Sequence, residues 1–572
     1  MTSAMLESDQ TARLDAILNE LAAGEKAWAE TDLAGRRRLL EEVHRATAAA
    51  AQDWVTAAVA YKQLQASSPL VGEEWISGPY GVLTGVAALI KSVAAIEAGR
   101  SPVDGYPLGT APGGRVTVKV LPHDNFDRLL LSGFSAEVWM RTGIDATRMR
   151  AEAGLALRHP ADTGGIGVVL GAGNITSIPV LDVLYELYAN NRVVLLKLNP
   201  ITDGLLGPFS RALKPLIDLG AVRIVTGAGD VGGYLVHHPL VAHVHMTGSA
   251  QTHDTIVWGT GVEAAARKQA GTPLLDKPVT SELGGVSPVI VLPGRWSAAD
   301  LRFQAEHVAT QRLHNGGYNC IATQVVIVSS QWPQKDAFLS ALRAVLAEAP
   351  DRAAYYPGSD ARVAHARAAY PGGEAIGGRV LIRDVLIPDD GDPDALTTEY
   401  FAPVLGVLEL PGDARTFLDA AVEAANERFT GTLGVNLIAD PRTISSLGPA
   451  LSSAIADLRY GTVAVNAWTA VGFLTPAATW GAYPGHTLED VGSGIGVVHN
   501  SLLLSGAERT VVRGPFRPAP RSVLHGELAL SPRPPWFVTS KTAATTGRLL
   551  TEFAARPRWS AMPSIVLSAM RG

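Results

Sequence analysis

Apolar residues recur along the chain with two different periods. Between residues 14 and 21, and again between 33 and 55, they follow the spacing of an amphipathic helix, which predicts helices over residues 10–65. From residue 165 onward, short apolar runs alternate with helical ones, as expected of strands joined by crossover helices. Such alternation is typical of a parallel, doubly wound sheet.

The alternation comes in two blocks, which predict two α/β domains with a cleft between them. In the first block we expect strands at 166–170, 193–196, 222–225 and 241–246, with helices beginning near residues 178, 204 and 231. In the second we expect strands at 287–291, 325–328, 404–408, 434–438 and 462–465, with helices at 298–313 and 334–347. Beyond residue 513 the Pro- and Arg-rich sequence predicts an extended arm that docks on the body or on another subunit.

Composition narrows the class of protein. A chain of 572 residues is too long for one hydrophobic core, and 47% apolar with 18% charged residues is a globular composition. A net charge of -6 leaves no basic footprint for nucleic acid. The N-terminus lacks a secretory signal, and the best apolar run, 81–90, is too short to span a membrane. One cysteine excludes an intramolecular disulfide, so we expect a cytoplasmic protein.

Two glycine-flanked segments carry candidate chemistry. In HNGGYNCIATQ, Cys320 follows a Gly-Gly pair, where the backbone can approach a ligand and a thiol is well placed as a nucleophile. A lone cysteine is more often a small buried hydrophobe. In TSELGGVSP, Glu282 precedes another Gly-Gly turn, as a solvated loop residue or as a general base.

Two further patterns stay open. The segment GAGDVGG (Gly227, Gly229 and Gly232) satisfies G-x-G-x-x-G between a strand and a helix, but no acidic residue follows at the expected distance. It is either a direct cofactor contact or a plain turn. His243 and His245 alternate along a strand and share one face, which favours a structural role over a metal site, and we predict no metal.

Taken together, ELGG and NGGYNC resemble the aldehyde dehydrogenase superfamily, in which an E-L-G-G turn precedes the nucleophilic cysteine. Further segments between residues 160 and 515 resemble that family in the same order: GAGNITSIP with Asn174, VVLLKLNP with Lys197, HMTGS with Thr247, Gly248 and Ser249, TEYFAPV with Glu399 and Phe401, and the closing GTVAVN and GSGIG. Departures at Gly173, Tyr318, His253 and Ala402 indicate a divergent member.

The resemblance implies two doubly wound α/β domains, a Rossmann-like cofactor domain and a catalytic domain, with a C-terminal arm. Residues 1–280 would form the N-terminal helices and NAD(P)-binding domain, 281–465 the catalytic domain, 466–513 a return segment with an oligomerisation strand, and 514–572 the arm. It further implies a homodimer or higher homo-oligomer, formed by pairing the strand at 509–513.

The resemblance also implies oxidation of a small-molecule aldehyde to an acid. Cys320 would form a thioester that Glu282 hydrolyses as general base, with Asn174 as oxyanion donor. NAD or NADP would be held by Lys197, Gly229, Thr247, Gly248, Ser249, Glu399 and Phe401. Because Pro200 stands where NAD-preferring relatives have an acidic residue, we expect NADP to be accepted.

Two alternatives remain at this stage. The first is a dehydrogenase or reductase that exchanges the acyl group with coenzyme A, although Glu282 favours hydrolysis. The second is a non-catalytic binding protein of the same fold, against which the joint retention of Cys320, Glu282 and Asn174 argues. The aromatic residues of segments 120–160 and 466–485 are expected to supply walls that suit a bulky or apolar aldehyde: Phe126, Phe134, Trp139, Trp468, Phe473 and Trp480.

Overall fold

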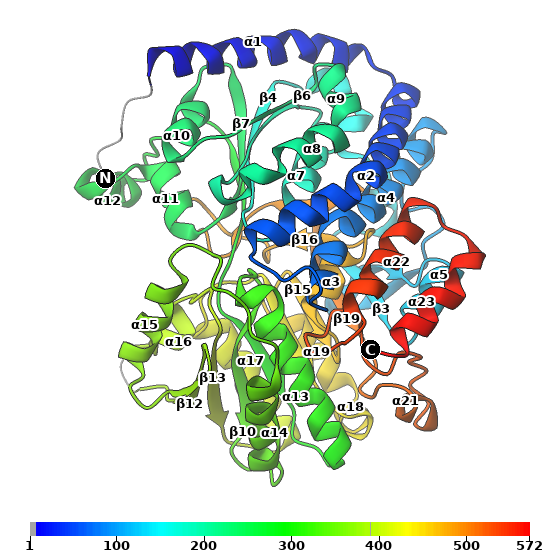
Figure 1. Ribbon diagram of the computed structural model, residues 1–572, viewed down its shortest axis with the longest axis vertical. Helices are drawn as coiled ribbons and strands as arrows, with labels where there is room; N and C mark the ends of the chain where they lie inside the picture. Colours follow the sequence, from blue (N-terminus) through cyan, green and yellow to red (C-terminus); the bar gives the residue numbers. More distant parts are fainter. Residues whose placement is uncertain (1–6, 389–390) are drawn as a thin grey trace.

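The structure is a computed structural model that describes residues 7–388 and 391–572. Two sheets organise it: one of six strands in the upper body of Figure 1 and one of eleven strands in the lower body. The predicted α/β class with two wound domains is confirmed. The C-terminal segments, drawn in red, lie against the side of the lower body.

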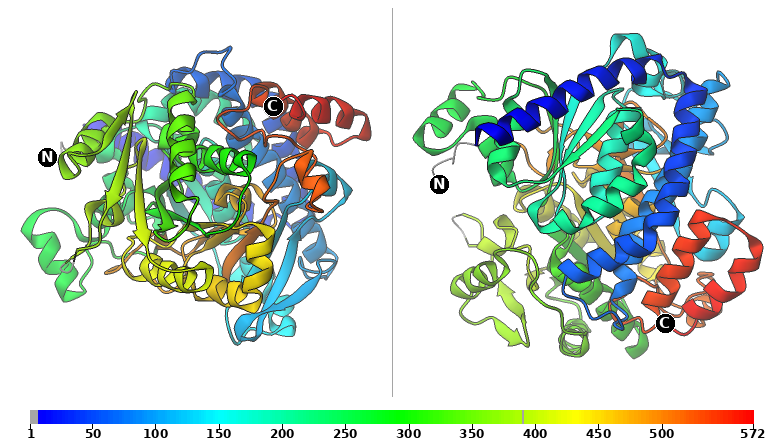
Figure 2. Two further views of the ribbon diagram at one scale, coloured as in Figure 1. Left: turned by 90° about the horizontal axis from the view of Figure 1, so that it is seen from below. Right: turned by 45° about the horizontal axis from the view of Figure 1, so that its top comes forward.

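The N-terminal helices cover the first sheet. α1 (Ser8–Glu30) and α2 (Leu33–Tyr61) wrap around it in the right-hand view of Figure 2. The two helices are separated at Asp32, whose side chain accepts a hydrogen bond from Gly35 N at 2.7 Å and so caps α2. The apolar face of α1, including Leu18 and Trp28, is buried, so the predicted helices over 10–65 are confirmed.

The first sheet is the cofactor-type sheet that the sequence predicts. Its order is β17-β8-β7-β4-β5-β6, parallel except for β17. Connections reverse direction at β4, which lies between β5 and β7, and ligands of such sheets bind at the carboxyl ends of strands around this point. The strands are β4 (Ile166–Leu170), β5 (Val193–Lys197), β6 (Val222–Val225), β7 (Val241–Gly248), β8 (Val279–Leu283) and β17 (Gly494–Ile495); the main helices are α7 (Ile178–Tyr188), α8 (Leu206–Ala212), α10 (Gly229–His237) and α11 (Ala250–Trp258).

The second sheet has the order β1-β2-β3-β19-β15-β14-β9-β10-β13-β12-β11. Its parallel centre runs through the strands predicted for the catalytic block, and helices cover both faces. The strands are β9 (Ser287–Val291), β10 (Thr323–Ser329), β11 (Glu374–Ile376), β12 (Arg379–Val385), β13 (Val404–Leu410), β14 (Gly434–Ile438), β15 (Thr462–Val465) and β19 (Ala507–Arg513), extended by β1 (Leu108–Ala111), β2 (Arg115–Leu121) and β3 (Ser135–Met140); the helices include α13 (Ala298–Leu313), α14 (Lys335–Glu348) and α17 (Ala414–Glu427).

The strand topology differs from the predicted domain division in two places. The boundary at residue 280 falls inside β8, which stays in the first sheet until Leu283. Strands β1 to β3 lie within the predicted first domain, yet they extend the second sheet. Periodicity alone could not show either fact, because which sheet a strand joins depends on pairing between distant segments.

The strand at 509–513 also differs from its prediction. β19 pairs in parallel with β15 on one edge and antiparallel with β3 on the other, all within one chain. A strand with both edges paired has no free N–H and C=O row to offer another subunit. The prediction that this strand pairs with another subunit is therefore wrong.

The C-terminal arm packs on the body of its own chain. Phe516 packs edge-on against Trp296, and Arg533 pairs with Glu306 at 2.9 Å. Helix α22 (Ala543–Ala555) packs on α3 (Val71–Trp75) so closely that a Cβ on Gly72 would lie 2.3 Å from the carbonyl carbon of Ala543. The arm ends in the helix α23 (Met562–Ala569).

One stretch of the described chain, Val71–Glu97, is long and apolar enough to cross a membrane by those two measures alone. It comprises α3, a π turn containing Pro79, and α4 (Gly81–Glu97). Half of its most apolar window is buried inside the molecule, and α4 packs on α2. Buried core helices share this composition, so the stretch does not establish a membrane span.

Candidate active site

Cys320 follows a tight backbone turn. Asn315, Gly316 and Gly317 adopt φ values of 56°, 72° and 85°, three left-handed residues in succession. At Gly317 a Cβ would lie 3.1 Å from the backbone of Ala402, so this position requires glycine for space as well as for conformation. The turn leads the chain from α13 to Cys320, just before β10.

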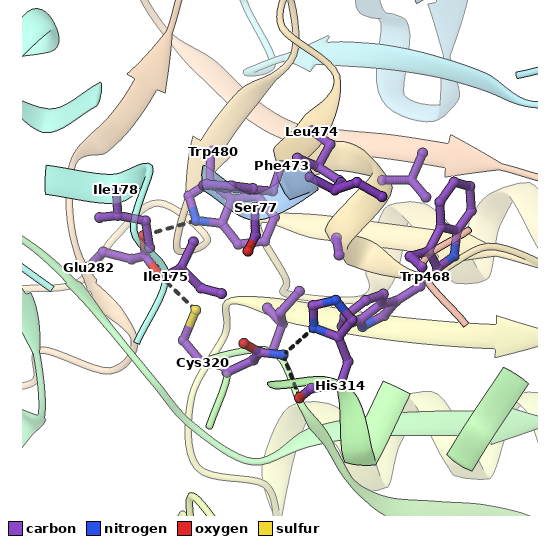
Figure 3. A pocket seen from close by; sticks show the side chains of 16 residues that line it. Ser77, Ile175, Ile178, Glu282, His314, Cys320, Trp468, Phe473, Leu474 and Trp480 are labelled. Carbon is purple, nitrogen blue, oxygen red and sulfur yellow. Dashed lines mark hydrogen bonds between the residues drawn. The ribbon is translucent and has the colours of Figure 1, made fainter. Parts of the chain in front are cut away.

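Glu282, near the carboxyl end of β8, lies beside the thiol. The Cys320 Sγ–H donates to Glu282 Oε1 at 2.9 Å, and the Trp480 indole N–H donates to Oε2 at 3.0 Å (Figure 3). Burial raises the pKa of Glu282. Burial and the adjacent carboxylate raise the pKa of the Cys320 thiol well above its usual range. In this arrangement the proton resides on sulfur, and Glu282 is the group placed to accept it.

Two cavities meet at this pair of side chains. Both Cys320 and Glu282 line a cavity of about 600 Å³ whose other walls are mainly apolar and aromatic, and both also line a larger cleft of about 1880 Å³. Figure 3 shows the first cavity, with Ile175 beside the thiol and Trp468 on the far side of the cavity. The reactive atoms therefore form the partition between two separate spaces.

The larger cleft brings together every predicted catalytic and cofactor residue. Lys197 ends β5, Thr247 and Gly248 end β7, and Gly229 begins α10, so the carboxyl edge of the first sheet supplies one wall. Glu399 and Phe401 reach the cleft from the second domain. Ser249 caps α11, its hydroxyl accepting from Thr252 N at 3.1 Å.

The cleft fits a nicotinamide dinucleotide on its own features. Within residues 7–388 and 391–572, Glu399 Oε1 is buried and accepts no hydrogen bond, and burial raises the pKa of this carboxyl to about 8. Such an unpaired acceptor suits a ribose hydroxyl. Lys197 pairs with no carboxylate of the described chain, and burial lowers its pKa. The amino ends of α10 and α11 face the same space and suit a pyrophosphate.

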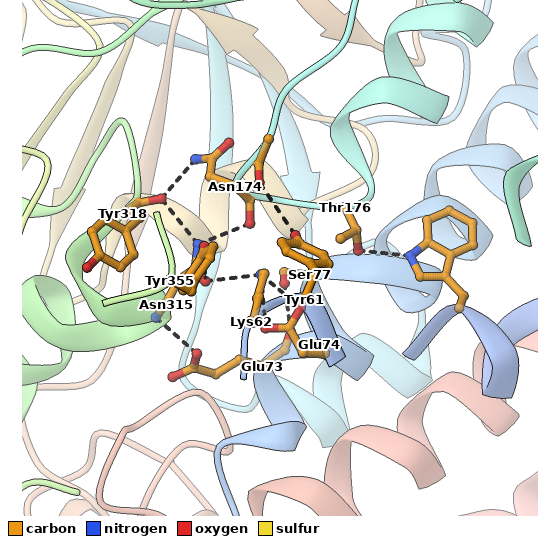
Figure 4. Close-up of polar contacts among 12 residues, drawn as sticks. Tyr61, Lys62, Glu73, Glu74, Ser77, Asn174, Thr176, Asn315, Tyr318 and Tyr355 are labelled. Atoms are coloured by element: carbon orange, nitrogen blue, oxygen red, sulfur yellow. Dashed lines mark hydrogen bonds and ion pairs between the residues drawn. The ribbon is translucent and has the colours of Figure 1, made fainter. Parts of the chain in front are cut away.

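A buried polar network holds the turn before Cys320. Asn315 Oδ1 accepts from Lys62 Nζ at 3.0 Å and from the Tyr355 hydroxyl at 2.9 Å, while its Nδ2 donates to Asn174 O and Tyr318 O, both at 3.1 Å (Figure 4). Lys62 pairs with Glu74 at 2.8 Å with both side chains fully buried. The Lys62 charge is neutralised by Glu74, and the hydrogen bonds to Asn315 hold the turn before Cys320 in one conformation.

The Asn174 side chain lies between the larger cleft and the nucleophile loop. Its Nδ2 donates to Tyr318 O at 2.9 Å, so one amide hydrogen binds the nucleophile loop. The second amide hydrogen has no such partner among the described residues. Asn174 lines the larger cleft beside Cys320, within the predicted group.

Replacing Asn315 is expected to disorganise the nucleophile. Asn315→Ala removes the shared hydrogen bonds and places a Cβ-bearing, non-Asn residue in a left-handed conformation, and turnover should fall by about a hundredfold. The measurement is kcat together with the rate of Cys320 alkylation. Asn315→Gly is the matched variant, because it permits φ of 56° but restores no hydrogen bond. Wild-type turnover in the glycine variant would show that conformation, not the network, matters.

The two histidines on β7 have carboxylate partners that the sequence did not reveal. His243 Nδ1 lies 3.2 Å from Glu186, and Asp182 lies 3.5 Å from His245 Nε2 and 3.1 Å from His499 Nε2. Burial alone would raise the pKa of Glu186, but the hydrogen bond and charge of His243 bring it to about 2. No cluster suited to a metal occurs in the part of the chain that the structure describes. These contacts join α7 to the sheet.

Several site residues were missed or misplaced by sequence reasoning. Of the aromatic residues expected in the walls, Trp468, Phe473 and Trp480 line the cavity at Cys320. Phe126 instead packs on Phe553 and Trp559, and Trp139 lies in the core of the second domain. Among the residues that no motif indicated are Ser77, Tyr356, Arg362 and Trp536, and they come from segments distant in sequence from Cys320.

Comparison with known proteins supports the same class. Residues 162–352 match the aldehyde dehydrogenase family. The chain is 30% identical over 234 residues to geranial dehydrogenase of Castellaniella defragrans, covering 38% of this chain and 44% of that protein. It is 35% identical over 129 residues to betaine aldehyde dehydrogenase 2 of Rhizobium meliloti, covering 22% and 23%. The chain thus matches less than half the length of these curated relatives.

Solved structures resemble the chain over most of its length. An NAD-dependent aldehyde dehydrogenase from Sinorhizobium meliloti has a TM-score of 0.56 at 20% identity, covering 88% of both chains. A mutant of aldehyde dehydrogenase C from Pseudomonas syringae, solved with NAD+ and octanal, has a TM-score of 0.56 at 17% identity, covering 89% of this chain and 90% of that one. The chain therefore has the aldehyde dehydrogenase fold.

The segment that holds Asn174, Lys197, Glu282 and Cys320 belongs to the aldehyde dehydrogenase family. The predicted resemblance is thereby confirmed, and the low identities agree with a divergent member.

Proposed function

We propose that the protein oxidises an aldehyde to a carboxylic acid with NAD or NADP, through a thioester on Cys320. One observation carries the proposal: the thiol and the Glu282 carboxylate, 2.9 Å apart, separate an apolar cavity from a cleft that fits a dinucleotide. An aldehyde entering from the first space would meet the nucleophile with the cofactor on its opposite side.

The first step uses the side chains of Cys320, Glu282 and Asn174. Glu282 accepts the thiol proton, and sulfur forms a bond to the aldehyde carbon as the carbonyl π electrons move to oxygen. The free amide hydrogen of Asn174 and the Cys320 N–H would stabilise that oxyanion, each by roughly 3 kcal/mol. A nicotinamide ring bound beside Glu399 and Phe401 would supply the two-electron oxidant that converts this adduct to a thioester.

Hydrolysis then returns the enzyme to its starting state. Once Glu282 has released the thiol proton to solvent, it takes a proton from water, whose oxygen attacks the thioester carbon. The C–S bond breaks with its electron pair on sulfur, and the thiolate then takes back a proton from Glu282. The Trp480 indole, which donates to the second carboxylate oxygen, holds Glu282 in one orientation. A carboxylate in this position favours water over coenzyme A as the acyl acceptor. Turnover that requires added coenzyme A would support the acylating alternative.

The experiment that tests the proposal follows absorbance of reduced nicotinamide across a panel of aldehydes with NAD and with NADP. We expect turnover with both cofactors. Asn199 and Pro200 line the cleft, and neither side chain has a carboxylate that would repel a 2′-phosphate. Asn199 Oδ1 instead accepts a hydrogen bond from Ile201 N at 3.2 Å. A preference for NAD of about a thousandfold, roughly 4 kcal/mol, would contradict this expectation.

A substitution at residue 200 sharpens the test. Pro200→Glu places a carboxylate beside the adenosine ribose and should lower kcat/KM for NADP by about tenfold or more while sparing NAD. Pro200→Gln is the matched control, since it has the same shape without the charge. Equal effects of the two variants on NADP would show that the change is steric.

A further inference from the structure

The apolar cavity at Cys320 adjoins a second one. A cavity of about 1130 Å³ shares Ile76, Trp468, Val471, Leu474 and Trp536 with the cavity that contains the thiol. The five shared side chains place the two spaces next to each other. Because Cys320 lines only the first of them, the second extends away from the reactive atoms.

The C-terminal arm builds the outer part of this second cavity. Pro534, Pro535, Trp536 and Phe537 line it from the arm, and Leu130 lines it from the short helix α5 (Asn125–Leu130). The arm is held in place beside it: Phe537 stacks on Phe303 at 5.4 Å between ring centroids. The docked arm is therefore part of a cavity wall that continues to the candidate active site.

The basic groups on this wall are paired or uncharged near pH 7. Arg517 pairs with Glu527 at 3.0 Å and with Asp300 at 3.3 Å. Burial lowers the pKa of His307 to about 4, so its imidazole is neutral near pH 7. Asp127 accepts a hydrogen bond from His123 N at 2.8 Å. Burial also raises the pKa of Asp127. A ligand with an anionic tail would find no unpaired cation among these groups, whereas a hydrocarbon tail would bury apolar surface.

We propose that the two cavities form one continuous site for a long, uncharged hydrocarbon chain, with the aldehyde carbon at Cys320 and the C-terminal arm as the outer wall. This inference rests on the proposed function and names its substrate class, a long-chain alkanal. It also gives the arm a role in specificity, through Trp536 at the junction of the two spaces.

Chain-length dependence tests the inference. For alkanals from propanal to dodecanal, kcat/KM should rise by about fourfold for each added methylene group until the second cavity is filled. Leu130→Trp fills part of that cavity far from the thiol, and should lower the ratio of kcat/KM for decanal to that for propanal by about tenfold.

Leu129→Trp is the matched control. Leu129 neighbours Leu130 on α5, and both side chains are half-buried against the same apolar cluster of the arm, but only Leu130 lines the cavity. The control should keep the wild-type ratio. Equal ratios in the two variants, or a wild-type kcat/KM that does not rise beyond butanal, would overturn the inference.

A binding measurement separates this inference from the proposed function. Cys320 is the only cysteine, so iodoacetamide labelling reports on this thiol alone. Alkanamides, which cannot be oxidised as aldehydes are, should protect Cys320 increasingly as their chains lengthen. If protection grows with the length of the alkanamide but the protein shows no dehydrogenase turnover, the proposed activity is refuted and the hydrocarbon-binding site is supported. Protection that is independent of length would refute the site.

Discussion

Cys320→Ala is expected to abolish aldehyde oxidation, lowering kcat by at least about ten-thousandfold. The chain has no second cysteine to take over the bond to the aldehyde carbon. The side chain is half-buried and small, so its loss should leave the fold intact. The measurement is steady-state formation of reduced nicotinamide, with cofactor binding followed in parallel by quenching of protein fluorescence.

Cofactor binding supplies the control for this variant. The predicted cofactor contacts come from other side chains, so Cys320→Ala should bind NAD or NADP as the wild type does. Retained turnover would refute covalent catalysis by this thiol. Loss of both turnover and binding would mean that the substitution damaged the cleft, and Cys320→Ser would then be the variant to compare.

Glu282→Gln is expected to separate acylation from hydrolysis. The amide keeps the size of the side chain and can still accept a hydrogen bond from the thiol, but it cannot take a proton from water. The variant should release about one equivalent of reduced nicotinamide per active site and then stall as the thioester. Rapid-mixing absorbance measures the burst, and mass spectrometry of the intact protein detects the acyl group on Cys320.

The same variant has a predicted effect on the thiol itself. Glu282 raises the pKa of Cys320 through its negative charge and by accepting the thiol hydrogen. Removing the charge stabilises the thiolate, so the pKa should fall and alkylation by iodoacetamide should occur at lower pH than in the wild type. An unchanged pH profile would mean that the carboxylate does not control the thiol. The burst requires that the thiol, freed of the adjacent charge, can lose its proton to solvent, and loss of the burst would mean that only Glu282 can accept that proton.

The strands and helices of both domains follow from local pattern. The runs at 166–170 and 287–291 are apolar at every position or nearly so, because both faces of a central parallel strand are covered by helices. Pairing is a different matter. The seven residues of β19 do not predict that the strand lies between β3 and β15 of the same chain, because both partners are remote in sequence.

The candidate site also contains two kinds of residue: those that sequence motifs indicate and those that only tertiary packing brings together. Glu282 and Cys320 stand in short glycine-flanked motifs, which is why they and the residues of the cleft could be named from sequence. Trp480 contacts Glu282 across 198 residues, and Glu186 meets His243 only because α7 packs on the sheet. Trp536 lies in an arm without any motif. Contacts of this kind depend on tertiary packing, which periodicity does not encode.

The position of β19 ties completion of the large sheet to the final stage of synthesis. When residues up to 500 have left the ribosome, β3 and β15 exist but the strand between them does not. Their unpaired N–H and C=O groups then face solvent and are open to another nascent chain. A chain that ends before residue 507 keeps both edges open permanently, so premature termination should yield fragments that associate with one another instead of closing the sheet.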